Sequence, residues 1–449
     1  MSTLKVGFGR VCITPTESVP LAGYGATSKR MSTSVLRDLY TTCIAFTDEQ
    51  NNTALVVTND LILASWEWAE PCREAMSQAT GVPYDNILLS CTHTHSGPDL
   101  GNTAHDSILR YKAQLPQLLT QAAVEAMADR KESKLLFGKT YIEGVNFVRH
   151  YVLDNGTYIG DNFGDASSGK ILRPTTEADH WMQIIRAQRE NADDIILVNW
   201  QTHPHREGGG KKTEISSDIV DCMRHTMEAR TGCRFAYFSG AGGNVNSRSR
   251  IKEDNLPGTE VACDAPACGS YMAYHAIRAL ETLRPLQGDA VKVCTRTLTV
   301  PTDHTMDHLA EIGLKLRQEW ERTGDGRACV EAGKPYGIHS PYHAGAIYNK
   351  SKLPMTRDVH MWAVSVGGLA FVGAPYEMFD TNGDQIKRGS PFASTFVCTC
   401  CNEYVGYIPS AYAYQHGCYE ADCTPIAPGS GEKLAMEYIS MLAELWNRE

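Results

Sequence analysis

Two histidines separated by one residue are the first candidates for chemistry in this chain. His93 and His95 lie in the segment Thr92–Pro98 (THTHSGP), directly after the apolar run Ile87–Cys91. The apolar run predicts a buried strand, and strand positions i and i+2 point to the same side. Both imidazoles could therefore enter one pocket at the end of the strand, as a metal ligand and a neighbouring acid or base. A surface loop, or histidines hydrogen-bonded within the core, is an equally good interpretation of this pair by itself.

Further polar motifs follow other predicted strands in the same way. They are Asn199–His205 (NWQTHPH), Ser239–Asn246 (SGAGGNVN), Pro375–Glu377 (PYE) and Asn402–Tyr407 (NEYVGY). Loops are polar in most proteins, which is the plain alternative. His, Glu and Tyr side chains directly after apolar strands nevertheless favour the rim of an active site built on a rigid sheet.

Composition narrows the class of protein. The chain has 449 residues, 42% of them hydrophobic and 21% charged, and a formal net charge of −10. These values are typical of a globular protein and argue against a general nucleic-acid or membrane surface. The N-terminus has no apolar core of signal-peptide length. With the odd number of 15 cysteines, this predicts a cytoplasmic protein with reduced thiols and a small-molecule substrate.

A group of cysteines offers a second metal hypothesis. Cys398, Cys400 and Cys401 lie close together in the sequence. Alternation along a predicted strand explains them as well as metal binding does, and we favour the strand.

The positions of apolar residues predict alternating strands and helices, with some strands joined as hairpins. This pattern indicates an α/β protein with mixed β-sheets flanked by helices. Ser217 is a candidate N-cap, and Pro116 should break its helix. The predicted strands are Ala54–Thr58, Ile87–Cys91, Trp181–Arg186, Ile195–Trp200, Phe235–Phe238, Val291–Val300, Trp362–Val372 and Ser394–Thr399. The predicted helices are Ser107–Asp129, Ser217–Arg230, Ala262–Leu283, Met306–Arg322, Met378–Arg388 and Gly431–Asn447.

Taken in order along the chain, the motifs resemble the catalytic N-terminal domain of the neutral/alkaline, non-lysosomal ceramidases and their bacterial relatives. The matching pieces are Ile13–Pro15, Ala22–Gly25, Thr92–Pro98, Asn199–Pro204, Ile215–Asp218, Gly240–Asn246, Glu377, and Tyr407 with Tyr419 twelve residues later. The resemblance covers nearly the whole chain. It implies one ceramidase-like domain over residues 1–449 and leaves open whether the chain forms a homo-oligomer.

The resemblance implies one zinc ion, bound by His93, His203, Glu377 and Tyr407, with His95 beside it as a hydrogen-bonding or acid/base residue. Nitrogen and oxygen ligands suit a catalytic zinc that keeps one position open for water. From the residues alone, Tyr407 could equally be a core or rim tyrosine. Glu377 could be an exposed acid at the start of a helix.

The resemblance also assigns substrate contacts. Arg149 matches an arginine near the scissile bond, although a surface ion pair is the alternative. Tyr419 matches a tyrosine that donates to the developing oxyanion. Asn246 stands where ceramidases carry a serine, which puts covalent catalysis in doubt. Ser247 is one register away and could replace that serine only if the loop slipped.

These residues predict a zinc-dependent hydrolase that cleaves an amide or ester bond of a small polar substrate by zinc-activated water. His95 would transfer a proton to the leaving group. True ceramidases are longer, with a secretion signal and a C-terminal immunoglobulin-like domain, so we do not expect ceramide as substrate. The alternatives are a zinc-dependent lyase or isomerase acting on a sugar-like substrate, and a binding protein that kept the fold.

Two further expectations concern the surroundings of this site. A second ion near Asp60, His95 and Asp218 would make the metal centre binuclear. Substrate specificity should depend on the loops Glu207–Glu214 and Thr323–Asn349, which carry no recognisable motif.

Overall fold

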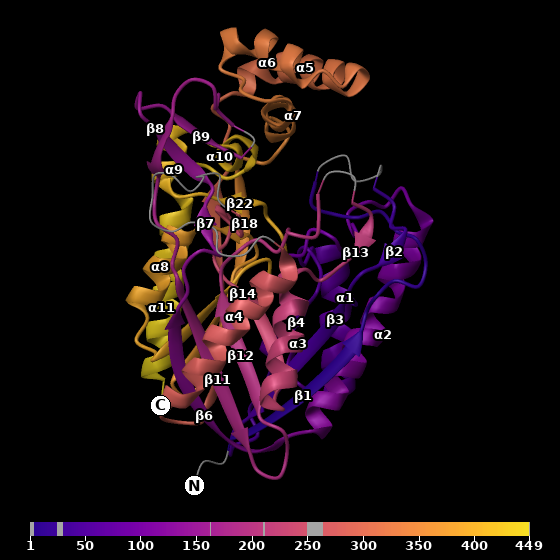
Figure 1. Ribbon diagram of the computed structural model, residues 1–449, viewed down its shortest axis with the longest axis vertical. Helices are drawn as coiled ribbons and strands as arrows, with labels where there is room; N and C mark the ends of the chain where they lie inside the picture. Colours follow the sequence, from indigo (N-terminus) through magenta and orange to yellow (C-terminus); the bar gives the residue numbers. More distant parts are fainter. Residues whose placement is uncertain (1–3, 25–29, 162, 210–211, 249–263, 449) are drawn as a thin grey trace.

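A large mixed sheet forms the centre of the protein (Figure 1). The computed structural model describes residues 4–24, 30–161, 163–209, 212–248 and 264–448. Within these residues the strand order is β14-β12-β11-β6-β1-β3-β4-β5, with β16 paired to β6. The β4–β5 and β12–β14 pairs are parallel and the other pairs of the sheet are antiparallel. The strands are β1 (Lys5–Cys12), β3 (Tyr40–Thr47), β4 (Thr53–Asn59), β5 (Ile87–Cys91), β6 (Lys131–Tyr141), β11 (Trp181–Arg189), β12 (Ile195–Trp200), β14 (Arg234–Ser239) and β16 (Arg284–Pro285).

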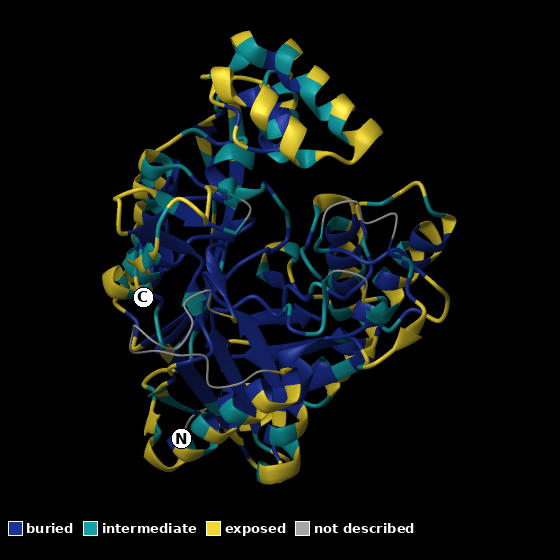
Figure 2. Cartoon of the chain, turned by 45° about the horizontal axis from the view of Figure 1, so that its top comes forward, coloured by how far each residue is buried: buried dark blue, intermediate teal, exposed yellow. Residues whose placement is uncertain are grey.

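A second, four-stranded sheet packs against the first. Its order is β17 (Val291–Pro301), β18 (Thr356–Val366), β19 (Leu369–Gly373) and β21 (Ser394–Cys398), with β19 and β21 parallel. Phe371 of this sheet lies 6.0 Å from Phe46 and 5.8 Å from Phe238 of the first, between ring centroids. Both sheets are therefore buried on the faces that meet, and the buried strands fill the centre of Figure 2.

Helices cover the two outer faces of this pair of sheets. Apolar faces of α1 (Trp66–Thr80) and α2 (Asp106–Ala128) pack on β1, β3, β4 and β5. The helices α3 (Ile219–Thr231) and α4 (Ala265–Ala279) cover β11, β12 and β14. On the far side, α8 (Asp380–Gly389) and α11 (Ser430–Asn447) cover the four-stranded sheet. This α/β architecture with mixed, helix-flanked sheets confirms the fold class expected from the sequence.

Short elements around one end of the two sheets complete the fold. Small sheets pair β2 (Ser34–Val35) with β13 (Glu214–Ile215), β7 (Phe147–Val148) with β15 (Val245–Asn246), and β20 (Glu377–Met378) with β22 (Tyr407–Ile408); a further one contains β8 (His150–Leu153), β9 (Tyr158–Gly160) and β10 (Ile171–Pro174). The helices α5 (Ala310–Thr323), α6 (Gly326–Gly333) and α7 (Pro341–Lys350) form the top of the molecule in Figure 1, next to α9 (Ala411–His416) and α10 (Tyr419–Cys423). Single 3-10 turns are η2 (Tyr84–Asn86), η3 (Leu280–Thr282), η4 (Asp307–Leu309) and η5 (Lys334–Tyr336).

Several local expectations were wrong. Pro116 does not break α2, because Leu115 and Leu119 on either side of it are buried and hold the apolar face on the sheet. Asp218, not Ser217, caps α3, with its carboxylate accepting from the backbone N–H of Ile219.

Two longer segments also differ from expectation. The predicted strand Trp362–Val372 is two antiparallel strands, because Gly367, at φ 53°, reverses the chain between β18 and β19. The segment Thr323–Asn349, expected as a loop, contains α6 and most of α7. The predicted helix start at Ala262 lies outside the described residues, and α4 begins at Ala265.

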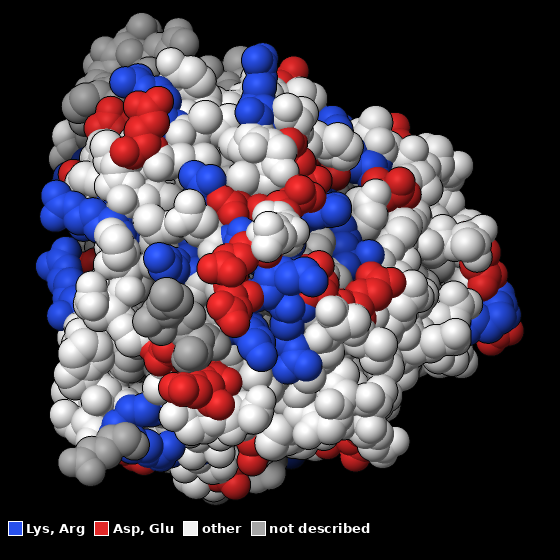
Figure 3. Space-filling view, turned by 90° about the horizontal axis from the view of Figure 1, so that it is seen from below, with Lys and Arg blue, Asp and Glu red and all other residues white. Residues whose placement is uncertain are grey.

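The surface seen in Figure 3 carries acidic and basic side chains interspersed, without one continuous basic field on that face. No helix among the described residues has the length and apolarity to span a bilayer.

Candidate functional site

The predicted metal ligands come together where several strands end. His93 follows β5 and His203 follows β12. Glu377 begins β20, and Tyr407 begins β22. These two strands are parallel, with Glu377 and Tyr407 directly opposite each other. Residues 93, 203, 377 and 407 therefore share one location, although they are far apart in the sequence.

The histidines form one compact cluster. The ring centroids of His93 and His203 are 4.8 Å apart, and His95 lies 5.1 Å from His93 and 5.3 Å from His203. The sequence predicted that strand alternation would turn His93 and His95 to the same side. That reason was wrong, because β5 ends at Cys91 and His93 has a positive φ of 71°. A hydrogen bond from its backbone N–H to the carbonyl of Leu61, at 3.0 Å, holds this turn and brings both rings to the same place.

Backbone carbonyls fix the tautomer of two of these histidines. His93 Nδ1 lies 2.6 Å from the carbonyl oxygen of Ile62. His203 Nδ1 lies 2.9 Å from that of Val245. A carbonyl oxygen only accepts, so each Nδ1 carries a proton, and in the neutral imidazole, the form that binds a metal, each Nε2 has a lone pair. Metal-binding histidines are commonly oriented in this way.

Both lone pairs face one carboxylate oxygen. Glu377 Oε2 lies 3.3 Å from His93 Nε2 and 3.6 Å from His203 Nε2. Glu377 Oε2 and His203 Nε2 are buried without a hydrogen-bond partner. Acceptors in such proximity need a proton or a cation between them. Two ligands of a tetrahedral zinc are about 3.3–3.4 Å apart, given metal–ligand distances of about 2.0–2.1 Å. The three residues therefore fit a zinc ion.

The protonation states of Glu377, His93 and His203 depend on one another. Burial alone would raise the pKa of Glu377, but His93 and His203 outweigh it and lower that pKa well below its usual range. Burial opposes the charged form of His93, yet Glu377 raises its pKa well above the ordinary value. Glu377 is therefore a carboxylate at neutral pH, as a metal ligand must be.

Tyr404 is a residue of the site that the sequence interpretation missed. Its hydroxyl donates to Glu377 Oε1 at 2.7 Å, so it holds the carboxylate oxygen that does not face the histidines. Burial and the negative charge of Glu377 raise the pKa of Tyr404 well above its usual value. The motif Asn402–Tyr407 contained this residue, but the resemblance directed attention to Tyr407 alone.

Tyr407 lies between Glu377 and the predicted substrate-contact residues. The ring of Tyr419 is 6.0 Å away, between centroids, and the guanidinium of Arg149 lies 5.9 Å from the Tyr407 ring. Burial, and after it Glu377, raise the pKa of Tyr407 well above the ordinary value. The phenol thus keeps its proton unless a cation stabilises the phenolate. Burial also raises the pKa of Tyr419, which keeps that hydroxyl a donor.

Arg149 is held by a buried carboxylate that the sequence interpretation also missed. Its Nε donates to Glu420 Oε1 at 2.7 Å and its Nη2 to the carbonyl of Gly243 at 2.8 Å. The second oxygen of Glu420 lies 2.9 Å from His150 Nε2. Glu420 is fully buried. Nothing in its spacing from Arg149 in the sequence indicates this pair.

Asn246 lies beside Arg149. Its Oδ1 accepts from Arg149 Nη1 at 3.4 Å, and its Nδ2 donates to the carboxylate of Asp161. Ser247, one residue on, is buried with its hydroxyl 3.4 Å from His205 Nδ1. The two side chains therefore have different partners, and Asn246 is the one that contacts Arg149.

His95 has both ring nitrogens buried without a hydrogen-bond partner. The ring lies against Gly23, where an added Cβ would come within 2.6 Å of His95 Nδ1, and edge-on to Tyr24 at 5.2 Å between centroids. Burial, and then the neighbouring His93, lower the pKa of His95 well below its usual value. The His95 imidazole is therefore neutral in the metal-free protein.

Two other metal hypotheses are not supported. Asp60 is bound to Arg224 Nη2 at 2.7 Å, and Asp218 caps α3, so neither carboxylate is free to join His95. Cys398 lies on β21 as alternation predicted, whereas Cys400 and Cys401 follow it. These cysteines do not belong to any group of metal-ligand atoms that converge within the described residues.

Comparison with solved structures shows one architecture. The chain is similar to a neutral ceramidase from Pseudomonas aeruginosa, with a TM-score of 0.72 and 14% identity over 99% of this chain and 75% of that one. It is similar to a ceramidase complexed with C2, with a TM-score of 0.72 and 15% identity over 100% of this chain and 76% of that one. The fold is ceramidase-like. No family model matches the sequence, and no curated protein matches it. The likeness expected from the motifs is therefore confirmed at the level of the fold.

Proposed function

We propose that this protein is a zinc-dependent hydrolase. The observation that carries the proposal is the position of Glu377 Oε2, 3.3 Å and 3.6 Å from the lone-pair nitrogens of His93 and His203. Tyr407, opposite Glu377 on the paired strands, would complete the ligand set. This donor set is of the kind that catalytic zinc uses, with one position open.

Zinc bound there would lower the pKa of a coordinated water towards about 7 and polarise the substrate carbonyl. The remaining steps belong to this chain's own groups. His95 has no hydrogen-bond partner on either ring nitrogen, so it is free to accept the proton of the attacking water and return it to the leaving group. The Tyr419 hydroxyl would donate to the oxyanion.

Arg149 and Asn246 act together in this scheme. Arg149 is held by Glu420 and Gly243 and donates to Asn246. Its charge is therefore fixed in place before substrate binds, which is the arrangement that electrostatic catalysis requires. Asn246 carries an amide and not a hydroxyl, so an acyl-enzyme at this position is not part of the proposal.

Amides are the first substrate class to test, because the similar solved structures are ceramidases, which act on an amide. We propose a small polar N-acyl compound, ester or lactone. The test is a screen of amides, esters and lactones with the zinc-loaded protein in H₂¹⁸O. A hydrolase places the label in the product acid.

A zinc-dependent lyase or isomerase acting on a sugar-like substrate is the second candidate. It is favoured by Asn246, which replaces the serine of ceramidases, together with His95 as a free base. Turnover without ¹⁸O incorporation would replace the hydrolase by this alternative. Stoichiometric zinc without turnover of any class would favour a binding protein.

A further inference from the structure

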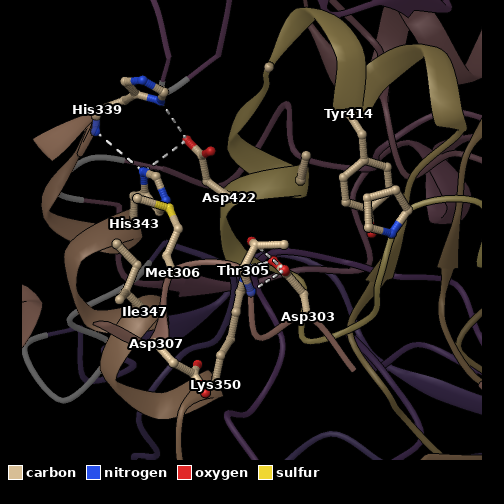
Figure 4. A pocket seen from close by; sticks show the side chains of 14 residues that line it. Asp303, Thr305, Met306, Asp307, His339, His343, Ile347, Lys350, Tyr414 and Asp422 are labelled. Atoms are coloured by element: carbon tan, nitrogen blue, oxygen red, sulfur yellow. Dashed lines mark hydrogen bonds and ion pairs between the residues drawn. The ribbon is translucent and has the colours of Figure 1, made fainter. Parts of the chain in front are cut away.

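A second group of metal-ligand side chains lies away from this site, between α7 and α10. His339 and His343 flank the start of α7, and Asp422 belongs to α10. Their ligand atoms all lie within 4.8 Å of one another. Figure 4 shows the two imidazoles turned towards the Asp422 carboxylate from the opposite wall.

The distances fit direct coordination. Asp422 Oδ2 lies 3.5 Å from His339 Nδ1 and 3.7 Å from His343 Nδ1. Ligands of a tetrahedral zinc are about 3.3–3.4 Å apart, so both carboxylate–imidazole distances lie within a few tenths of an ångström of that separation. The backbone N–H of His339 donates to His343 Nδ1 at 3.3 Å. His343 Nδ1 is therefore unprotonated, and a metal ion would displace this long hydrogen bond to reach its lone pair.

The surroundings allow an ion to enter and to complete its coordination with water. The three side chains line a cavity of about 300 Å³, together with Asp303, Asp307 and Lys350. More than half of the His339 side chain is exposed. Lys350 is the lysine that lines this cavity. Asp303 pairs with it at 2.9 Å, which offsets its positive charge.

A third group of ligand-type side chains in the described residues has a cationic neighbour. It consists of His150, Cys418 and Glu420. Arg149 forms an ion pair with Glu420 there. A cation at that location would meet an adjacent guanidinium, so we do not assign it a metal.

We propose that His339, His343 and Asp422 bind a divalent transition-metal ion of the zinc class, which ties α7 to α10. Two imidazole nitrogens and a carboxylate oxygen are ligands that such ions prefer. This site is separate from the proposed catalytic zinc and does not depend on it.

The ion would stabilise the wall of the active site. The helix α10 also carries Tyr419 and Glu420. From α7, the ring of Tyr342 contacts that of Tyr419 at 5.8 Å between centroids. A link between His343 and Asp422 would therefore hold both helices in the positions that set Tyr419 beside Tyr407.

The experiment counts zinc in the full-length protein after dialysis against zinc alone. Wild type should retain one more zinc per chain than His339→Ala or Asp422→Asn, because each variant lacks one of the three ligands of that additional ion. His308→Ala is the matched control, because His308 is an exposed histidine of η4, outside the proposed ligand set. It should bind as much zinc as wild type.

Crystals of the zinc-loaded wild type should show anomalous scattering between His339, His343 and Asp422. Equal zinc content in wild type, His339→Ala and Asp422→Asn would overturn the proposal, and so would absence of that anomalous peak. All these variants keep His93, His203 and Glu377. The difference in zinc content between them therefore still tests this site if the active-site residues bind no zinc.

Discussion

The hydroxyl of Tyr404 donates to Glu377 Oε1 at 2.7 Å, while Glu377 Oε2 faces the imidazoles of His93 and His203. One carboxylate thus has an oxygen fixed by the protein and an oxygen directed at the proposed metal position. Partners of this kind orient a ligand and tune its basicity.

Removing the Tyr404 hydroxyl should weaken zinc binding without abolishing it. In Tyr404→Phe the carboxylate of Glu377 loses its fixed oxygen, and zinc affinity should fall about 10–100-fold. Competition with a chromogenic chelator measures this. Tyr438→Phe also removes a buried tyrosine hydroxyl, which bonds the carbonyl of Gly373, and should leave zinc affinity unchanged. Equal affinity in wild type and Tyr404→Phe would contradict the proposed role of Tyr404.

Replacing either lone-pair histidine should remove the metal itself. His93→Ala and His203→Ala each delete one of the ligands whose Nε2 faces Glu377, so both variants should lose the catalytic zinc and all activity. Metal analysis after loading with excess zinc and dialysis measures the loss, as one zinc per chain less than in wild type. His225→Ala, at an exposed position on α3, is the control. Stoichiometric zinc and activity in both active-site variants would rule out this centre.

Glu420 should make stability depend on pH in the acidic range. Burial would raise its pKa, but Arg149 and His150 outweigh it and lower the pKa to about 2, from an ordinary 4.5. Because the folded-state pKa is depressed, this stabilisation is complete above about pH 4.5 and is lost as the pH falls towards 2. The shift corresponds to about 3 kcal/mol.

Glu420→Gln should therefore be less stable than wild type at pH 7, by about 3–5 kcal/mol, because Arg149 stays buried without its carboxylate. The difference should shrink as the pH falls below 4.5. Urea unfolding between pH 7 and pH 3 measures it. Glu17→Gln, at an exposed pair with Arg110, should scarcely change stability. A Glu420→Gln deficit that stays constant down to pH 3 would contradict the assigned pKa.

The elements that the sequence predicted well are those with continuous apolar runs. The bounds of β5 and β12 agree with prediction because Ile87–Cys91 and Ile195–Trp200 are buried along their whole length. The predictions failed at a local break overridden by packing, at Pro116, and at a tight turn, at Gly367. The first is a tertiary effect, which propensity alone does not contain; the second is a hairpin signal, Gly367-Gly368, that the sequence itself carries.

The residues of the candidate site also differ in how far the sequence predicts their positions. The histidine and glutamate motifs follow strands that the sequence indicates, so their proximity could be expected. The contacts of Tyr404 and Glu420 could not, because β20 and β22 are two-residue strands and α10 has five residues. Elements of that length have no periodicity to recognise. His339 and His343 flank the start of α7, in a segment that was expected to be a loop, which concealed their geometry.

Asn246 and Ser247 decide whether the reaction uses water directly. Asn246 accepts from Arg149 and donates to Asp161, so Asn246→Ala should free Arg149 Nη1 and lower turnover about 10²–10³-fold without abolishing it. Asn246→Ser should retain much of the activity, because a hydroxyl can also hold a water. Ser247→Ala should be nearly silent, since its hydroxyl contacts His205 and not Arg149. An inactive Ser247→Ala, with an acyl adduct on Ser247 trapped in wild type during turnover, would instead make Ser247 the nucleophile and replace direct attack by water with a covalent route at the same metal centre.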